Sequence, residues 1–154
     1  MTDLVLTLVV VGVILATTVP FLLNRLTLEQ QQTDIDQAIA LTLERLQQQV
    51  ITRINQCALS RAVTVSDLNL PEPTRHTLPH LRVFVEKNGN IISNVALTFT
   101  LTSEAKAQRI NQGMRLTNVW GVRHGKELTI TQPVTYLDSQ LKRMYYDVAT
   151  GCFQ

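Results

Sequence analysis

Hydrophobic residues dominate the first part of the chain without interruption. From Leu4 to Leu23 there are 20 consecutive residues with no charged side chain. At about 1.5 Å per residue, a helix of this length spans the roughly 30 Å hydrocarbon core of a bilayer. Buried core helices of soluble proteins are typical of shorter apolar runs, and a secretory signal has a basic segment before a shorter one. The pattern therefore predicts a retained transmembrane helix over residues 1–23.

Beyond this run, apolar residues recur every three or four positions. They are Ile35, Ile39, Leu43, Leu46, Val50, Ile54 and Cys57. This period places them on one stripe of a helix. The opposite face is rich in Gln and mixed in charge: Gln37, Glu44, Arg45, Gln47 and Gln48. Because residues 24–59 contain neither Gly nor Pro, we expect the helix to continue to residue 59.

The amphipathic stripe of residues 24–59 needs an apolar partner. Its spacing resembles a heptad, but the charges that flank coiled-coil seams are sparse here. We therefore expect the stripe to pack on the domain that follows, residues 60–154, with a coiled coil as the alternative.

Residues 60–154 predict one globular domain that mixes helix and strand. Residues 60–80 contain Pro71, Pro73 and Pro79, which indicate a connecting loop with one short element over residues 63–70. Alternation over residues 81–85 and 95–101, on either side of Asn88-Gly89, predicts a β-hairpin. Thr98, Thr100 and Thr102 fall on the other face of its second strand.

A short helix and three further strands are expected after the hairpin. Ser103 is a suitable N-cap for a helix that ends near Gly113. Residues 116–122, 127–134 and 143–149 predict a three-stranded meander, with a turn over residues 123–126 and Pro133 near a strand end. We expect Trp120, Tyr136, Tyr145 and Tyr146 to be core or sheet-face residues. The predicted fold is α+β, an antiparallel sheet covered by the long helix.

Composition narrows the class of function. Hydrophobic residues make up 45% of the chain, enough to bury a core, which excludes an intrinsically disordered protein. The 14 Lys and Arg residues give a net charge of only +2 and form no cluster, so we expect no nucleic-acid partner.

The histidines are the only candidates for metal or acid–base chemistry. His76 and His80 are four residues apart, but Pro79 argues against a helix that would align them, and no further ligand is close in sequence. There is no glycine-rich phosphate loop and no nucleophile motif. We expect no enzymatic activity, no cofactor and no small-molecule substrate. The alternative is a membrane-anchored periplasmic enzyme or metal-binding protein that uses His76, His80 and His124.

The two cysteines bear on the compartment. Cys57 precedes the globular part and Cys152 lies at its end. We expect a structural disulfide between them, with two unpaired buried thiols as the alternative. A disulfide favours a periplasmic domain. Arg25, directly after the apolar run, weakly favours the opposite orientation, with the domain in the cytoplasm.

Spacing within the apolar run resembles that of the type IV pilin and pseudopilin superfamily. Pilins carry an acid near the start of the helix, a Gly about nine residues later and a Pro eight residues beyond it. Asp3, Gly12 and Pro20 show this spacing. The segment 63–68 is also similar to the loop after the first helix of type IVb and conjugative minor pilins. The family usually has Glu in place of Asp3, and no leader with a preceding Gly is present.

This resemblance implies a pilin-like subunit or assembly component of a type IV pilus or related secretion system. Its expected location is the bacterial inner membrane, as a single-pass protein with a periplasmic C-terminal domain, and its expected partners are other pilin-like or assembly-platform proteins. Asp3 would pair with the N-terminal amine of a neighbouring subunit; alternatively, lipid headgroups hydrate it. The chain also resembles the small PilM-type inner-membrane proteins of plasmid thin-pilus systems.

Overall fold

A long helix begins the structure. The computed structural model describes residues 2–55, 62–88, 91–134, 146–147, 149–150 and 152–153. Helix α1 runs from Thr2 to Asn55, which confirms the predicted continuous helix as far as it is described. Residues 56–59, its predicted end, lie outside the described residues. The chain forms two compact units, unit 1 (Met1–Asp34) and unit 2 (Ile35–Gln154), so the second part of α1 belongs to the globular unit.

Unit 2 contains a four-stranded antiparallel sheet. Its strands are β1 (Arg82–Asn88), β2 (Ile91–Thr100), β3 (Trp120–His124) and β4 (Glu127–Pro133). They are arranged in the order β1-β2-β4-β3. The β1–β2 hairpin was expected from its alternating pattern and is present, although residues 89–90 of its turn lie outside the described residues. The long apolar helix and this sheet confirm the α+β class.

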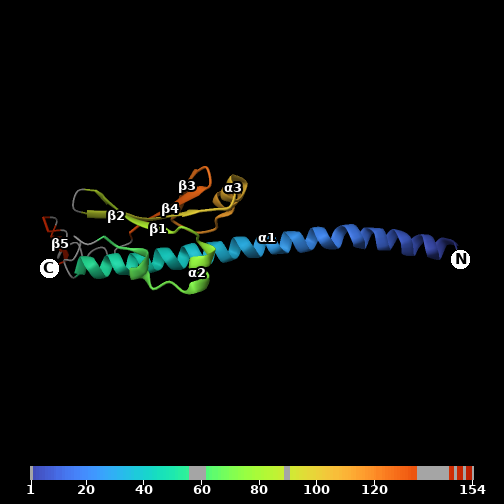
Figure 1. Ribbon diagram of the computed structural model, residues 1–154, viewed down its shortest axis with the longest axis horizontal. Helices are drawn as coiled ribbons and strands as arrows, with labels where there is room; N and C mark the ends of the chain where they lie inside the picture. Colours follow the sequence, from blue (N-terminus) through green and yellow to red (C-terminus); the bar gives the residue numbers. More distant parts are fainter. Residues whose placement is uncertain are drawn as a thin grey trace. The chain divides into compact units, whose positions relative to one another are not determined.

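The core of unit 2 lies between α1 and one face of the sheet, which we call the inner face (Figure 1). On α1, the predicted stripe is buried at Ile35, Ile39, Leu43, Leu46, Val50 and Ile54, each no more than 5% exposed. Alternate residues of β2 and β4 supply the other side: Val95, Leu97, Phe99, Leu128 and Ile130, all fully buried. The apolar stripe therefore packs within its own chain, as expected.

Helix α3 (Glu104–Gly113) packs on the same inner face beside β3. Ser103 caps it, because its Oγ accepts a hydrogen bond from the backbone N–H of Lys106 at 3.2 Å. A Cβ on Gly121 would clash with Oδ1 of Asn111 and would lie 3.3 Å from Cδ1 of Ile130. The missing side chain at Gly121 thus allows α3 to lie close against β3.

The segment between α1 and the sheet is more structured than a connecting loop. It contains a 3₁₀ helix, η1 (Val65–Leu68), and helix α2 (Glu72–Thr77). Two of the prolines that indicated a loop, Pro71 and Pro73, stand at the start of α2, where a missing N–H has no intrahelical partner to lose, and Pro79 follows the end of that helix. The guanidinium of Arg53 lies 2.9 Å from the carboxylate of Asp67, which ties η1 to α1.

The end of the chain departs from the predicted meander. The strand expected over residues 116–122 begins only at Trp120, because Asn118 adopts a left-handed φ of 58° within a turn. The next turn is also shorter than expected, since Arg123 and His124 belong to β3. Strand β5 (Tyr146–Asp147) pairs with β6 (Cys152–Phe153) in a separate two-stranded sheet. Most of residues 143–149 lie outside the described residues.

Candidate functional site

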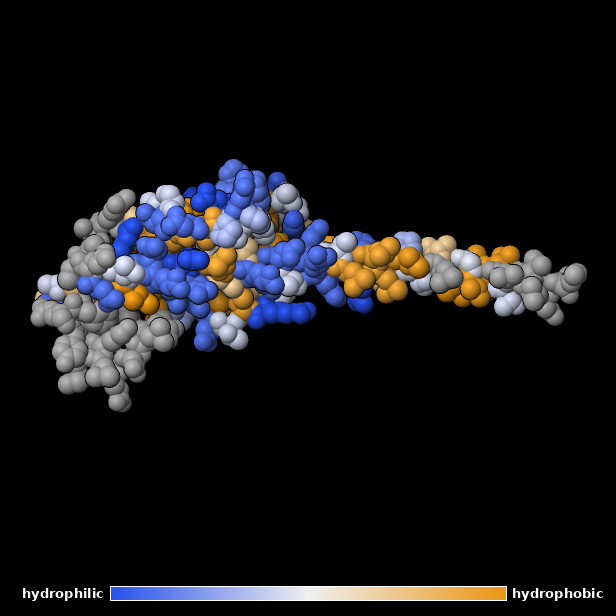
Figure 2. Space-filling model, turned by 90° about the horizontal axis from the view of Figure 1, so that it is seen from below, coloured by the Kyte–Doolittle hydropathy of each residue, from blue (hydrophilic) through white to orange (hydrophobic). Residues whose placement is uncertain are grey.

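The first part of α1 exposes large hydrophobic side chains. They include Val9, Val10, Val11, Val13, Ile14, Val19, Phe21, Leu22, Leu23 and Leu26, each between 46% and 63% exposed. Figure 2 shows these hydrophobic residues along the N-terminal part of the helix. By length and composition, α1 is a helix that could cross a membrane, and none of its most apolar window is buried in the described chain.

Two hydroxyls within this part of α1 are bonded to the helix itself. The hydroxyl of Thr18 donates to the carbonyl oxygen of Ile14 at 2.7 Å, and that of Thr27 donates to the carbonyl of Leu23 at 3.0 Å. A hydroxyl bonded to its own backbone needs no water. The guanidinium of Arg25 lies 5.7 Å from the centre of the Phe21 ring, so the first cation of the chain rests over an aromatic side chain.

The residues that carried the pilin resemblance all lie in α1. Asp3, Gly12 and Pro20 belong to the one helix, and Pro20 is exposed. A Cβ on Gly12 would meet no atom of this chain within 4 Å. The structure does not describe the side chain of Asp3, so the pairing of this carboxylate with a neighbouring amine stays a prediction.

Of the two cysteines, only Cys152 is among the residues that the structure describes. Cys152 lies in β6 and is 4% exposed, as expected of a residue in the fold's interior. Cys57 lies outside the described residues. The disulfide between them therefore stays a prediction.

The three histidines occupy different elements. His76 lies in α2, with Nε2 3.8 Å from a carboxylate oxygen of Glu72. His80 follows that helix with a left-handed φ of 54°, and His124 ends β3. His76 and His80 therefore do not share a helix face. Within the described ranges, no group of three His, Cys, Asp or Glu residues is placed to hold a metal ion.

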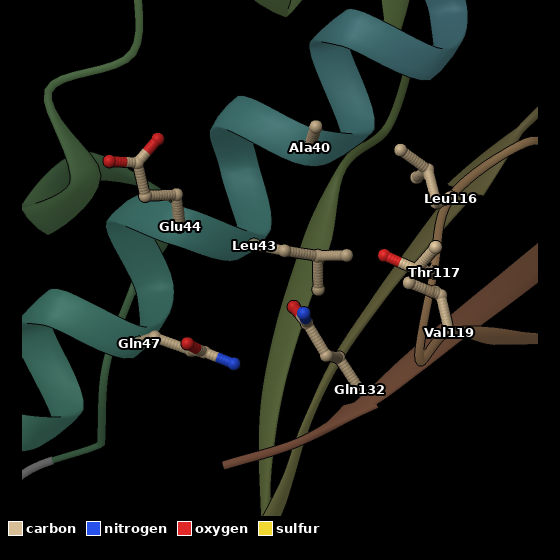
Figure 3. A pocket seen from close by; sticks show the side chains of 8 residues that line it. All are labelled: Ala40, Leu43, Glu44, Gln47, Leu116, Thr117, Val119 and Gln132. Carbon is tan, nitrogen blue, oxygen red and sulfur yellow. The ribbon is translucent and has the colours of Figure 1, made fainter. Parts of the chain in front are cut away.

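A cleft of about 230 Å³ opens between α1, β4 and the segment after α3. Its lining residues are Ala40, Leu43, Glu44, Gln47, Leu116, Thr117, Val119 and Gln132 (Figure 3). The amide of Gln47 is engaged in the fold, because its Nε2 donates to the carbonyl of Pro133 at 3.2 Å. The sequence placed Gln47 on the polar helix face; the structure places it at the seam between α1 and β4.

Three exposed hydrophobic residues of unit 2 were not recognised as a group from the sequence. Phe84, Trp120 and Val122 are 46%, 46% and 47% exposed. The register joins Phe84 to Ala96, Ala96 to Thr131 and Thr131 to Trp120, so these four residues form one row across the sheet. Val122 stands beside Thr129 in the next row on the same face. Trp120 is thus a sheet-face residue and not a core residue.

Comparison with known proteins identifies no relative. No protein family, no curated protein and no solved structure matches this chain. The basis for a function is therefore the chain itself: its apolar helix, its α+β unit and the spacing of its N-terminal residues.

Proposed function

We propose that this chain is a non-enzymatic, single-pass inner-membrane component of a type IV pilus or related secretion machine. Residues 1–23 are its membrane anchor, unit 2 lies in the periplasm, and its partners are other pilin-like or assembly-platform proteins. The observation that carries the proposal is the change of character along α1. The helix exposes apolar side chains on all sides at its start and buries a single stripe in an α+β domain at its end.

Physical chemistry supports this combination of anchor and domain. An exposed apolar helix surface of this extent is costly in water but matches the interior of a bilayer. The hydrogen bond of the Thr18 hydroxyl to its own helix lowers the cost of placing that hydroxyl in lipid. The Asp3, Gly12 and Pro20 spacing then favours a pilin-like anchor over a generic one.

The orientation of unit 2 is tested with a reporter fused after Gln154. Alkaline phosphatase is active only after export, so we expect activity at this junction. An active cytoplasmic reporter at the same junction would place unit 2 in the cytoplasm and remove the case for a disulfide.

Assembly function is tested by complementation of a strain that lacks this protein. Wild-type protein should restore piliation or secretion, and so should the triple variant His76→Ala, His80→Ala, His124→Ala. Replacement of residues 1–23 by an unrelated single-pass anchor should not restore it, because a pilin-like helix contributes more than attachment. Loss of function in the histidine variant at normal protein levels would favour an anchored enzyme or metal protein instead. Full rescue by the unrelated anchor would contradict a pilin-like role for the helix.

A further inference from the structure

Strand β1 stands at one edge of the four-stranded sheet. Among the described strands it pairs only with β2, and the register is regular from Arg82 to Glu86, before a bulge at Glu86 and Lys87. The other side of an edge strand carries a row of N–H and C=O groups that can pair with a further strand. We call this side of β1 the free edge.

Hydrogen bonds around β2 identify the backbone groups at the free edge. The carbonyl of Ser93 accepts from the N–H of Val134, so residue 93 of β2 directs its backbone groups toward β4. Successive residues of a strand direct these groups to opposite sides, so the even-numbered residues of β2 bond to β1. Their partners on β1 are Arg82, Phe84 and Glu86. The N–H and C=O groups of Val83 and Val85 therefore point to the free edge.

Side chains of residues 82–86 alternate between the two faces of the sheet. Val83 and Val85 are half-buried and pack against the core of unit 2. The side chains of Arg82, Phe84 and Glu86 are exposed on the opposite face, and Phe84 is 46% exposed. The segment therefore has a valine on each side of Phe84 and opposite charges at its two ends.

We propose that β1 pairs edge to edge, in antiparallel register, with β1 of a second copy of this chain. The two-fold axis passes between the two Phe84 residues, so each surface is its own partner. Arg82 of each copy lies opposite Glu86 of the other copy, and Val83 lies opposite Val85. The N–H and C=O groups of these two valines bond across the axis, which is the alternation that an antiparallel ladder requires.

A second copy fits the free edge because residues 82–86 complement themselves. Opposite charges and aromatic pairs directly across an antiparallel ladder both stabilise it. In this register Phe84, Arg82 and Glu86 occupy the non-hydrogen-bonded positions, where side chains of the two strands are closest. An axis at Val83 or Val85 would instead place Phe84 opposite a charged side chain.

Edge strand β3 does not complement itself in this way. An axis through its central residue, Val122, would place Trp120 opposite His124 and Gly121 opposite Arg123. No pair of opposite charges results. The same physical argument therefore selects β1 and not β3 as the edge that pairs.

The charged residues of β1 can form the new pairs while they keep their bonds within the chain. Arg82 contacts Glu127 through one terminal nitrogen, and a guanidinium has five N–H donors in total. The carboxylate of Glu86 accepts from the amide of Asn94 through Oε2 at 2.7 Å, and within the described residues its Oε1 accepts no hydrogen bond. The contact between copies therefore adds ion pairs without breaking existing ones.

The test is disulfide formation between copies of the full chain in detergent micelles, and it does not depend on the proposed function. Non-hydrogen-bonded partners in an antiparallel ladder have Cα atoms about 4.5 Å apart, within the range that a disulfide spans. Phe84→Cys should therefore give a covalent dimer on mild oxidation, seen in gels without reductant. The wild type, whose cysteines are Cys57 and Cys152, should stay a monomer.

Val122→Cys is the matched control, because it places a thiol at a similarly exposed position of the other edge strand. It should give several-fold less dimer than Phe84→Cys. Equal yields from the two variants would show random collision and overturn the proposal. Absence of a dimer from Phe84→Cys protein with wild-type circular dichroism would overturn it as well.

The register is tested by a change of charge in the Phe84→Cys background. Glu86→Lys brings two cations together at each end of the pairing and should lower the dimer yield several-fold, with unchanged circular dichroism. Glu44→Lys makes the same change at an exposed position of α1 and should leave the yield unchanged. A yield that Glu86→Lys does not lower would refute the proposed register.

Amide hydrogen exchange of the unsubstituted chain distinguishes a second copy from any other occupant of the free edge. The N–H groups of Val83 and Val85 should exchange more slowly as the protein concentration rises, whereas that of Phe84, bonded to β2, should be slow throughout. Protection of the two valines that does not change with concentration would mean that something else covers this edge, and it would overturn the proposal.

Discussion

The two parts of α1 are both rich in apolar residues, but only the second part covers them within this chain. In unit 1, Val13 and Leu22 are 58% and 55% exposed; in unit 2, Ile39 and Leu46 are fully buried. The sequence difference is one of pattern. Residues 4–23 of unit 1 carry no charge on any side, whereas the α1 residues of unit 2 repeat their apolar side chains every three or four positions. A helix that is apolar on every side matches the interior of a bilayer, which surrounds it with lipid. A helix with one apolar stripe matches a protein partner that packs on that side only.

The largest effect should come from truncation in the buried stripe. Leu46→Ala should lower the free energy of unfolding of unit 2 by about 2–5 kcal/mol, because it removes buried methyl groups and leaves a cavity. Urea unfolding followed by circular dichroism in detergent measures this change. Leu22→Ala makes the same substitution at an exposed position and should leave that free energy unchanged. Equal losses in the two variants would refute the division of α1 into differently solvated parts.

A charge placed in the apolar run should impair membrane insertion and leave the stability of unit 2 unchanged. Val13→Lys should cost about 3 kcal/mol for membrane insertion, since a Lys at the centre of a spanning helix is strongly unfavourable. The inserted fraction, measured by alkaline extraction of membranes, should fall. Unit 2 should keep its stability, because Val13 contributes nothing to its core. Gln31→Lys, beyond the apolar run, is the control and should insert normally. Normal insertion of Val13→Lys would argue that this segment does not span the bilayer.

A smaller effect is expected at the start of α3. Ser103→Ala removes the side chain that accepts from the N–H of Lys106, and it should destabilise unit 2 by about 1 kcal/mol. Ser103→Asp keeps an acceptor at this position and should retain the stability. Thermal unfolding of the two variants compares them directly. A loss in Ser103→Asp equal to that in Ser103→Ala would show that the cap does not stabilise α3.

Periodic segments were the part of the fold that the sequence predicted well. The stripe on α1 and the alternation in β1 and β2 arise because each element buries one face, and burial leaves its period in the residues. The capping of α3 by Ser103 was predicted for a similarly local reason.

Elements without a local period were missed. Helix α2 is only six residues long, and its prolines indicate a loop equally well. The pairing of β5 with β6 joins strands of two residues each, too short to carry any alternation. The placement of β4 between β2 and β3 depends on contacts far apart in the chain, which a local pattern does not record.

The sheet face that carries the exposed residues Phe84, Trp120 and Val122 illustrates a different limit. An apolar residue on alternate positions of a strand has the same pattern whether a helix covers it or not. Trp120 was therefore expected in the core or on the sheet, and only the register with Thr131 and Ala96 assembled the row that ends at Phe84. The sequence predicted that Trp120 lies in the core or on a sheet face, but not its grouping with Phe84 and Val122.

The hydrogen bond from Gln47 to Pro133 joins residues 86 positions apart, and this separation has a consequence for the synthesis of the protein on the ribosome. Ribosomes add about 5–20 residues per second, so β4 follows this part of α1 by roughly 4–17 s. During that interval the apolar stripe has been made, but β4, one of the two strands that cover it, does not yet exist. The nascent chain must therefore pass several seconds with a hydrophobic helix that is incompletely covered, and exposed apolar surface of this kind is what chaperones bind.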